Sequence, residues 1–496
     1  MTRKAGVLLP ISSLPGEYGI GDFGRAATFF ADFIADLGFK IWQILPIGML
    51  GPGNSPYSGG SAFAGNYLFI DLESLPERLL NDSEKASAKL ASTYKVDYFG
   101  VRNNKGRLLK LAYSRLNADD FAAIEAFKKS NSWLEDYALY MAIRNEKGTE
   151  WENWEEPLRL REKTAIAAAK DRLKAAVGYY EFEQYLFYTQ WAALKKAVNA
   201  RGIEIFGDMP IYVSYNSPDV WAHPENFLLD KDRRPEKVAG VPPDYFSPEG
   251  QLWGNPLYNY KYMEKHGYNW FITRILHNLE LYDMLRIDHF RGFYEYWAVP
   301  SEAESAKEGA WEKGPQMKLW KELKKQKPDA KIVAEDLGII DDGVRNYLQE
   351  TGFPGMRVLQ FAFDGSKDNP HLPYNYDKNI VAYTATHDND TSLGWLYSLP
   401  GGARDDVLDF IGVGAFEWGA GGKHCKSTQA MIKAIAVSSA DTAIFPLQDL
   451  TGYGSDTRIN IPGVPDGNWE YRITLSTLED IDSEFIRKTL NRFGRV

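Results

Sequence analysis

The sequence predicts an α/β protein, a (β/α)8 TIM barrel, because short apolar runs alternate with helical patterns along the chain. Eight runs have the length and composition of strands that are buried on both faces, as in a parallel sheet. They cover residues 5–9, 40–46, 202–208, 284–288, 331–336, 356–363, 380–388 and 442–449. Eight such strands favour a closed barrel over an open doubly wound sheet. The first βα turn also lacks the G-x-G-x-x-G fingerprint of a dinucleotide-binding fold.

The segment between the first two strands predicts a helix. Phe30, Ile34 and Leu37 recur at helical spacing, and Gly38 follows them where a C-terminal cap belongs. This helix completes a βαβ unit, which is the building block of a parallel barrel.

The spacing between the second and third strands is too long for one connecting helix. It is largely helical, and its last helix places Phe187, Trp191, Leu194 and Val198 on one face. We therefore expect a single catalytic barrel over residues 1–496, with a helical subdomain inserted at about 74–200.

A second long connection, at about 210–270, is rich in Pro, Gly, Asn and aromatic residues. Long loops in compact domains are often lids or binding loops. We expect this segment to form such loops, with Tyr245, Phe246, Trp253 and Tyr258 covering a bound ligand.

Composition limits the partners and the compartment. Hydrophobic residues make up 44% of the 496, which is enough for a large core and disfavours disorder. The net charge of −10, without a basic run, argues against nucleic acid or an anionic membrane surface. No segment approaches the roughly 18 apolar residues of a membrane span, and the apolar patch at 7–9 is too short for a signal peptide. The lone Cys425 excludes an internal disulfide and fits a reducing compartment. We expect a soluble cytoplasmic protein; its oligomeric state is not indicated.

Acidic residues end four of the predicted strands: Asp208, Asp288, Glu335 and Asp388. In a barrel, the C-terminal ends of the strands form the face where active sites are built. Like charges that crowd together are destabilising unless a site uses them. These four positions therefore predict an active site on this face.

The surroundings of these acids suggest different roles. Arg286 lies two residues before Asp288, on the same side of the strand, and favours an ionised carboxylate that can act as a nucleophile. A structural ion pair gives the same pattern. Residues 332–334 are apolar, so desolvation is expected to raise the pKa of Glu335 and make it a general acid. Asp388, beside His387, is placed to form hydrogen bonds with ligand hydroxyls. Such a set suits glycoside chemistry.

Other interpretations remain open. "HDND" (387–390) contains possible metal ligands but has no clustered histidine partner. "GPGNSPYSGGSAFAGN" (51–66) is either a surface loop or a ligand loop, and it lacks the lysine and the spacing of a phosphate-binding P-loop. Asp208 precedes Met209 and Pro210 and would also suit a turn cap.

Seven motifs together resemble one enzyme family. They are "GNSPYSGGSAFAGN", "GDMPIYV", "GQLWGNPLY", "LRIDHFRGF", "VAEDLG", "TATHDND" and "RINIPGV…NW". In this order they are similar to the 4-α-glucanotransferases, or amylomaltases, of glycoside hydrolase family seventy-seven. The similarity runs from about residue 5 to residue 469.

The resemblance implies roles for individual residues. Asp288 matches the nucleophile, Glu335 the general acid/base and Asp388 the stabiliser of the transition state. The implied substrate contacts are Tyr57, Ser58, Asp208, Gln251, Trp253, Arg286, His387 and Asn460. The implied activity is retaining transfer between α-1,4-glucan donors and acceptors, on a (β/α)8 barrel, without a metal or an organic cofactor. An α-amylase-like hydrolase is the nearest alternative, and a barrel that binds sugar without catalysis is a more distant one.

Overall fold

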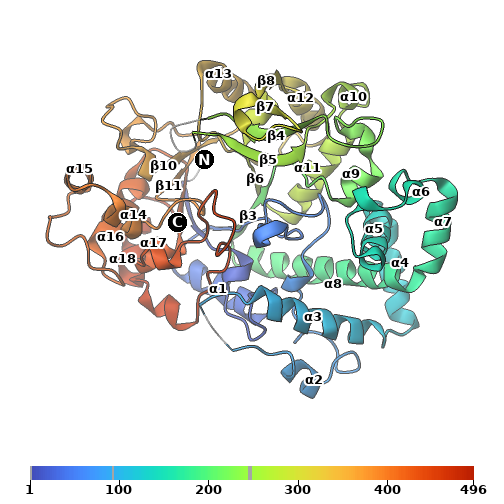
Figure 1. Ribbon diagram of the computed structural model, residues 1–496. Coiled ribbons are helices and arrows are strands. Elements are labelled where there is room, and N and C mark those ends of the chain that lie inside the picture. The colour runs from blue at the N-terminus through green and yellow to red at the C-terminus, as the bar shows by residue number, and fades with distance from the viewer. Residues whose placement is uncertain (1–2, 92–93, 244–247) are drawn as a thin grey trace.

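The computed structural model describes residues 3–91, 94–243 and 248–496 (Figure 1). Its centre is an eight-stranded parallel sheet. The strands are β1 (Lys4–Leu8), β2 (Ile41–Gln43), β3 (Glu204–Met209), β6 (Met284–Ile287), β9 (Ile332–Ala334), β10 (Gly355–Val358), β11 (Ile380–Tyr383) and β12 (Thr442–Pro446). Each overlaps one of the eight predicted apolar runs.

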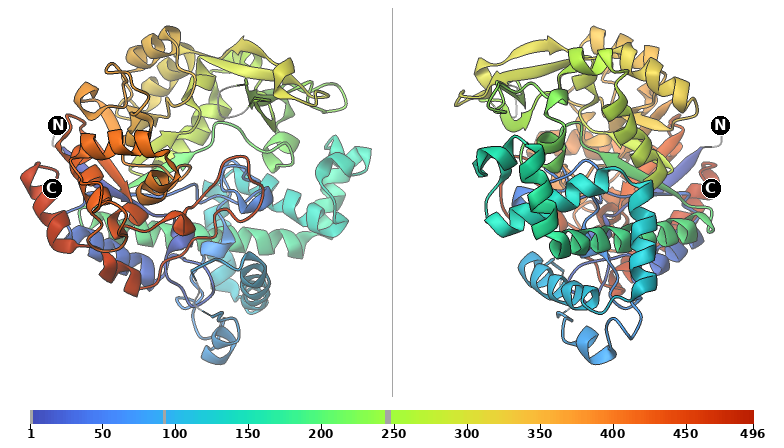
Figure 2. Two further views of the ribbon diagram at one scale, coloured as in Figure 1. Left: turned by 60° about the vertical axis from the view of Figure 1, so that its left-hand side comes forward. Right: turned by 90° about the vertical axis from the view of Figure 1, so that its right-hand side faces the viewer.

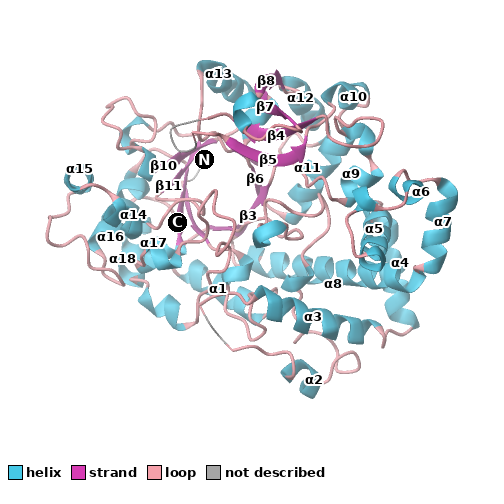
Figure 3. Ribbon diagram, viewed as in Figure 1, coloured by secondary structure: helices cyan, strands magenta, loops and turns pink. Residues whose placement is uncertain are grey.

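The sheet closes on itself in chain order. Neighbouring strands pair from β10 through β11, β12, β1, β2, β3 and β6 to β9. Between β9 and β10 the N–H of Ala334 donates to the carbonyl oxygen of Pro354 at 2.9 Å. Helices surround the strands, as Figure 3 shows. The predicted (β/α)8 barrel is therefore confirmed.

Helices on the outside of the barrel connect successive strands. The predicted first one is α1 (Arg25–Asp36), which buries Phe30 and Ile34, and Gly38 follows it with a φ of +96°. A positive φ is open to glycine without a Cβ clash, which explains the stop at this position. The others are α11 (Asn269–Leu281), α12 (Met317–Gln326), α13 (Asp342–Thr351), α14 (Ser392–Ser398), α15 (Gly401–Ile411) and α16 (Lys426–Val437). Two further helices, α17 (Leu447–Thr451) and α18 (Ser483–Arg492), follow the last strand.

Seven helices lie between β2 and β3 in the described residues. They are α2 (Asp82–Ala86), α3 (Tyr98–Tyr113), α4 (Ala118–Ser130), α5 (Trp133–Lys147), α6 (Glu156–Arg159), α7 (Lys163–Arg172) and α8 (Lys174–Asn199). In α8 the four predicted face residues, from Phe187 to Val198, are buried. Figure 2 shows α4 to α8, in teal and green, gathered at one side of the barrel.

A second, antiparallel sheet was not predicted. Its order is β5 (Gln251–Pro256), β4 (Lys237–Val241), β7 (Glu295–Pro300) and β8 (Ala310–Lys313), with α9 (Pro218–Ala222) and α10 (Tyr260–Lys265) nearby in sequence. The first four residues of β5 are exposed and include Gly254, at a φ of +75°. The segment thus lacks the apolar pattern by which a strand is recognised.

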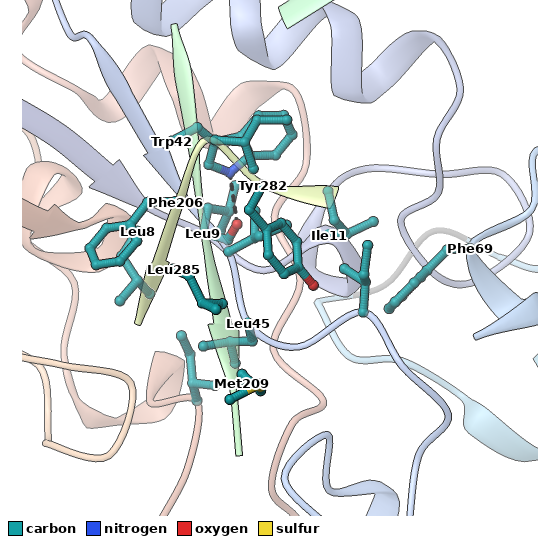
Figure 4. Close-up of a cluster of buried hydrophobic side chains, with 14 of the residues drawn as sticks. Leu8, Leu9, Ile11, Trp42, Leu45, Phe69, Phe206, Met209, Tyr282 and Leu285 are labelled. Carbon is teal, nitrogen blue, oxygen red and sulfur yellow. Dashed lines mark hydrogen bonds between the residues drawn. The ribbon is translucent and has the colours of Figure 1, made fainter. Parts of the chain in front are cut away.

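The core around the barrel strands is closely packed (Figure 4). Leu8, Trp42, Phe206 and Leu285 come from four neighbouring strands and are almost fully buried. Leu8 and Phe206 share one face of the sheet, and Trp42 lies on the other face, against Phe30 of α1. Burial of each such side chain contributes about 1.5–3 kcal/mol. A Cβ on Gly207 would lie 2.1 Å from the Tyr282 ring, so only glycine lets this helix-to-strand contact form. In the described part of the chain, no helix is long and apolar enough to cross a membrane.

Candidate active site

The proposed nucleophile and the proposed acid/base leave neighbouring strands at the same level. Ile287 of β6 pairs with Ala334 of β9, and Asp288 and Glu335 are the next residue in each chain. The N–H of Glu335 donates to the carbonyl oxygen of Ile287 at 3.1 Å. Two carboxyl groups that are distant in sequence therefore start from adjacent backbone positions at the C-terminal end of the barrel.

Arg286 forms an ion pair with the carboxylate of Asp288. Its guanidinium is buried and donates to Asp288 Oδ1 at 2.8 Å and to Asp208 Oδ2 at 2.6 Å. Arg286 and Asp208 are register partners on β6 and β3. The predicted pairing of Arg286 with Asp288 is confirmed, and the second carboxylate fixes the guanidinium from the other side. Charge-assisted bonds of this kind are stronger than neutral ones.

Asp208 is an interior group in this structure. Its side chain is buried, and the Tyr57 hydroxyl donates to its Oδ2 at 2.7 Å. Burial raises the pKa of Asp208, an effect that the Arg286 charge opposes. Its Oδ2 thus binds both Arg286 and Tyr57, while its predicted role as a sugar contact stays a prediction.

Glu335 is held by two main-chain donors. The N–H of His289 donates to Oε2 and the N–H of Leu337 to Oε1, each at 2.8 Å. Burial raises the pKa of Glu335 to about 8, helped by the negative charge of Asp288 and opposed by Arg286 and the Leu337 N–H. A carboxyl group with this pKa is largely protonated at neutral pH, as a general acid must be.

His289 joins this carboxyl group to the second sheet. Its backbone has a φ of +50° and a ψ of +48°, the left-handed region that is uncommon for residues other than glycine. Its ring meets Trp253 of β5 edge-on, with 4.9 Å between ring centres. No role was predicted for His289, because the residue type alone does not identify a left-handed backbone.

Asp388 stands in the turn after β11, on the far side of the groove. The Asn460 amide donates to its Oδ1 at 2.7 Å, and His387 Nε2 lies 3.3 Å from its Oδ2. Tyr57 stacks on the His387 ring at 5.1 Å, with 7° between the planes. The loop of Tyr57, the turn of Asp388 and the segment of Asn460 thus form one connected wall.

A groove with a volume of about 550 Å³ runs between these groups. It is lined by Tyr57 and Ser58 on one side, by Gln251 and Trp253 of β5 on another, and by Asp288, Asp388 and Asn460. The Trp253 indole N–H donates to Gln251 Oε1 at 3.1 Å. Seven of the predicted residues, from five separate segments, therefore meet at one groove. Glu335 and Asp208 are not among its lining residues, and Arg286 and His387 are buried.

Some expectations fail or fall outside the described residues. Tyr258 does not cover the groove: it is buried and its hydroxyl donates to the Ile211 carbonyl oxygen at 2.8 Å. Tyr245 and Phe246 lie outside the described residues. Two further residues, Trp469 and Arg458, were missed, although both stand in a motif that was recognised. Trp469 lines the groove, and Arg458 donates to the Asp388 carbonyl oxygen at 2.8 Å.

The metal and phosphate interpretations have no support from the contacts. Among the described residues, no group of three or more His, Cys, Asp or Glu side chains is arranged to hold a metal ion. The Asn389 side-chain oxygen accepts from both the N–H and the hydroxyl of Thr386, so it stabilises the turn that follows β11. In the 51–66 loop, the N–H of Ala62 donates to the Asp219 carboxylate, a bond that a phosphate-cradling amide would not make.

A (β/α)8 barrel with carboxyl groups gathered at the C-terminal ends of its strands is typical of enzymes that act on glycosidic bonds. Residues 9–477 match the family model described as 4-alpha-glucanotransferase, and the chain belongs to this family.

Relatives of known sequence and structure agree with this assignment. The chain is 45% identical to a 4-alpha-glucanotransferase of Aquifex aeolicus, over 99% of both proteins. It is 42% identical to a 4-alpha-glucanotransferase of Thermus thermophilus, over 95% of both. It also resembles the solved structure of an amylomaltase from Streptococcus agalactiae in complex with acarbose, with a TM-score of 0.95, 36% identity and 99% of each chain covered.

Proposed function

We propose that this enzyme is a retaining 4-α-glucanotransferase. It moves segments of α-1,4-glucan to the 4-hydroxyl of glucose or of another α-1,4-glucan. The observation that carries the proposal is the pairing of Asp288, bound by Arg286, with a Glu335 whose pKa is about 8, at adjacent strand ends. The family membership gives the substrate class.

The first step cleaves the donor. Glu335 gives its proton to the glycosidic oxygen, while a carboxylate oxygen of Asp288 attacks the anomeric carbon. The bond between that carbon and the glycosidic oxygen breaks. The released fragment leaves with a new 4-hydroxyl, and the rest of the donor remains as an ester of Asp288.

The second step reverses the roles. Glu335, now a carboxylate, takes the proton of an acceptor 4-hydroxyl, whose oxygen attacks the anomeric carbon. The ester bond breaks and Asp288 regains its charge. Both steps use only carboxyl groups, so the scheme invokes no metal and no organic cofactor.

The other residues act by position and charge. Arg286 keeps Asp288 in place through the bond at 2.8 Å. Asp388, held by Asn460 and adjacent to His387, supplies the negative charge that stabilises the positively charged sugar ring.

Transfer rather than hydrolysis requires that water be kept from the ester. Trp253 lines the groove and contacts His289, which binds Glu335.

We assign the segment at about 210–270 as the cover of the groove, the segment at about 74–200 as an inserted helical subdomain, and the whole of 1–496 as one catalytic unit. A cytoplasmic location is also proposed, supported by the single, buried Cys425.

Incubation with maltotriose tests the proposal. A transferase yields glucose together with chains longer than maltotriose. An α-amylase-like hydrolase yields only shorter sugars, and a non-catalytic sugar-binding barrel yields no new sugar although oligosaccharides bind. Either of the last two outcomes refutes the proposed function, and the Asp288→Asn variant serves as the inactive control.

A further inference from the structure

A second large cavity lies apart from the catalytic groove. Its volume is about 710 Å³, and it lies between the loop that follows β1, the first turns of α1, residues 71–73 and residues 474–476. It shares no lining residue with the groove. The mechanism described above does not use it.

Apolar side chains form part of its lining and remain open to solvent. Phe29 of α1 is 50% exposed and Leu475 is 56% exposed. Single exposed apolar residues are common on protein surfaces, but here two of them line one cavity. An exposed phenyl ring offers a flat apolar surface that a ligand with an apolar face can cover.

Polar groups converge on the same cavity. Asp71 accepts from the N–H of Glu73 at 3.0 Å, which leaves further acceptor capacity on its carboxylate. Arg25 is exposed and supplies donors, and the hydroxyls of Thr474 and Ser476 lie 2.8 Å apart. A mainly apolar cavity with a few convergent polar groups is the usual form of a small-molecule site.

The charged groups at the cavity balance one another. Four acidic residues, Glu17, Asp22, Asp71 and Glu73, line the cavity together with a single cation, Arg25. Three lysines lie beside these acids: Lys89 binds Glu17 at 2.6 Å, Lys105 binds Asp22 at 3.1 Å, and Lys85 donates to the Glu73 carbonyl oxygen at 3.1 Å. Their charges and that of Arg25 balance the four carboxylates, so the lining carries no excess charge that would select a charged ligand. A neutral polyhydroxyl ligand suits carboxylate acceptors beside an aromatic ring.

We infer that this cavity is a second, non-catalytic binding site for α-1,4-glucan. One glucose ring stacks on Phe29 while its hydroxyls donate to Asp71 and accept from Arg25. The inference rests on the proposed function, which supplies the glucan. Its role is to retain a polymeric substrate while other chain ends enter the groove.

The location supports this role. The loop that follows β1 leaves the same end of the barrel that carries the catalytic carboxylates. Its residues 10–13 border a small pocket together with Trp469, which also lines the groove, and its residues 15–18 line the cavity. The loop thus borders the cavity directly and reaches the groove through a small pocket that shares Trp469 with it.

Affinity electrophoresis through a gel that contains amylopectin tests the inference. The Asp288→Asn protein is used so that the polymer is not consumed during the run. Phe29→Ala in this background should raise the apparent dissociation constant for amylopectin about tenfold, as expected from the loss of one buried phenyl contact. Phe121→Ala is the matched control, because Phe121 is 48% exposed on α4 and does not line the cavity. Thermal unfolding checks that both variants are folded.

The outcomes separate this inference from the proposed function. In the active enzyme, Phe29→Ala should leave the disproportionation of maltotriose unchanged. If maltotriose is disproportionated but Phe29→Ala and Phe121→Ala are retarded by amylopectin as strongly as the parent, the second site is refuted and the function stands. If the parent enzyme does not act on maltotriose, the proposed function itself fails.

Discussion

The main-chain nitrogen of His289 lies 2.8 Å from Oε2 of Glu335, so the residue after the proposed nucleophile directly binds the proposed acid/base. This contact depends on the left-handed backbone of His289, with a φ of +50°. For residues other than glycine this conformation costs about 1–2 kcal/mol, and Asn and His tolerate it better than β-branched residues. Strain of this size persists where the surroundings enforce it, often in active sites.

Two substitutions at His289 should therefore distinguish the effect of its backbone N–H on Glu335 from the effect of its imidazole ring. His289→Gly keeps the left-handed conformation and the N–H bond, whereas His289→Val disfavours both. Loss of this N–H removes a contact that favours the charged carboxylate, so the pKa of Glu335 should rise further in the Val variant. We expect the alkaline limb of the kcat profile to move to higher pH in His289→Val and to move less in His289→Gly. Identical profiles would show that the N–H has no influence on Glu335.

Asp288→Asn should abolish transfer without unfolding the protein. An amide cannot form the glycosyl ester, and we expect kcat on maltotriose to fall at least about 1,000-fold. Arg286 keeps its bond to Asp208 at 2.6 Å in this variant, so its buried charge is still paired. The unfolding temperature should accordingly stay close to that of the parent. Near-normal turnover of the Asn protein would remove Asp288 from the mechanism.

The raised pKa of Glu335 has consequences for both activity and stability. Because the acid form is needed in the first step, kcat/KM should fall as the pH rises through about 8. The folded-state pKa of about 8 exceeds the usual value of 4.5, so the stability from this group is fully present below pH 4.5 and is lost as the pH rises through about 8.

Glu335→Gln tests both consequences, since it removes the charge but keeps the shape. This variant should lose activity on maltotriose. It should gain in unfolding temperature relative to the parent, most of all above pH 8. A gain that is equal at pH 4 and pH 9 would contradict the raised pKa.

Tyr57 provides a test of how much the buried contacts around Asp208 contribute to stability. Its hydroxyl donates to Asp208 and its ring stacks on His387. Tyr57→Phe keeps the ring but leaves a buried carboxylate short of one donor, which should cost about 1–3 kcal/mol in the free energy of unfolding. Tyr374→Phe is the control, because the Tyr374 hydroxyl makes an exposed bond of 3.3 Å. Urea unfolding of both variants measures the difference, and equal stabilities would mean that the bond to Asp208 contributes nothing.

Much of the barrel and part of the site could be predicted because their signals are local. Barrel strands are buried on both faces and therefore appear as continuous apolar runs. The pairing of Arg286 with Asp288 follows from the two-residue period of a strand. The bond from Arg286 to Asp208 crosses between strands and depends on register, which the sequence did not reveal. Likewise, β5 escaped recognition because its side chains face solvent and the groove rather than a core.

Trp253 is the residue by which exclusion of water can be tested. It lines the groove and meets the ring of His289 at 4.9 Å, and the His289 N–H binds Glu335, the carboxyl group proposed to activate the acceptor. Removing the indole in Trp253→Ala should admit water to the glycosyl ester and raise the ratio of hydrolysis to transfer at least about threefold. Trp253→Phe retains an aromatic edge and should change the ratio less. Trp311→Ala is the control, since Trp311 of β8 is as exposed as Trp253, at 37%, and does not line the groove. The ratio is measured as reducing ends formed per glucose released from maltotriose. If the Ala variant loses transfer but keeps the parental ratio, Trp253 binds sugar without excluding water.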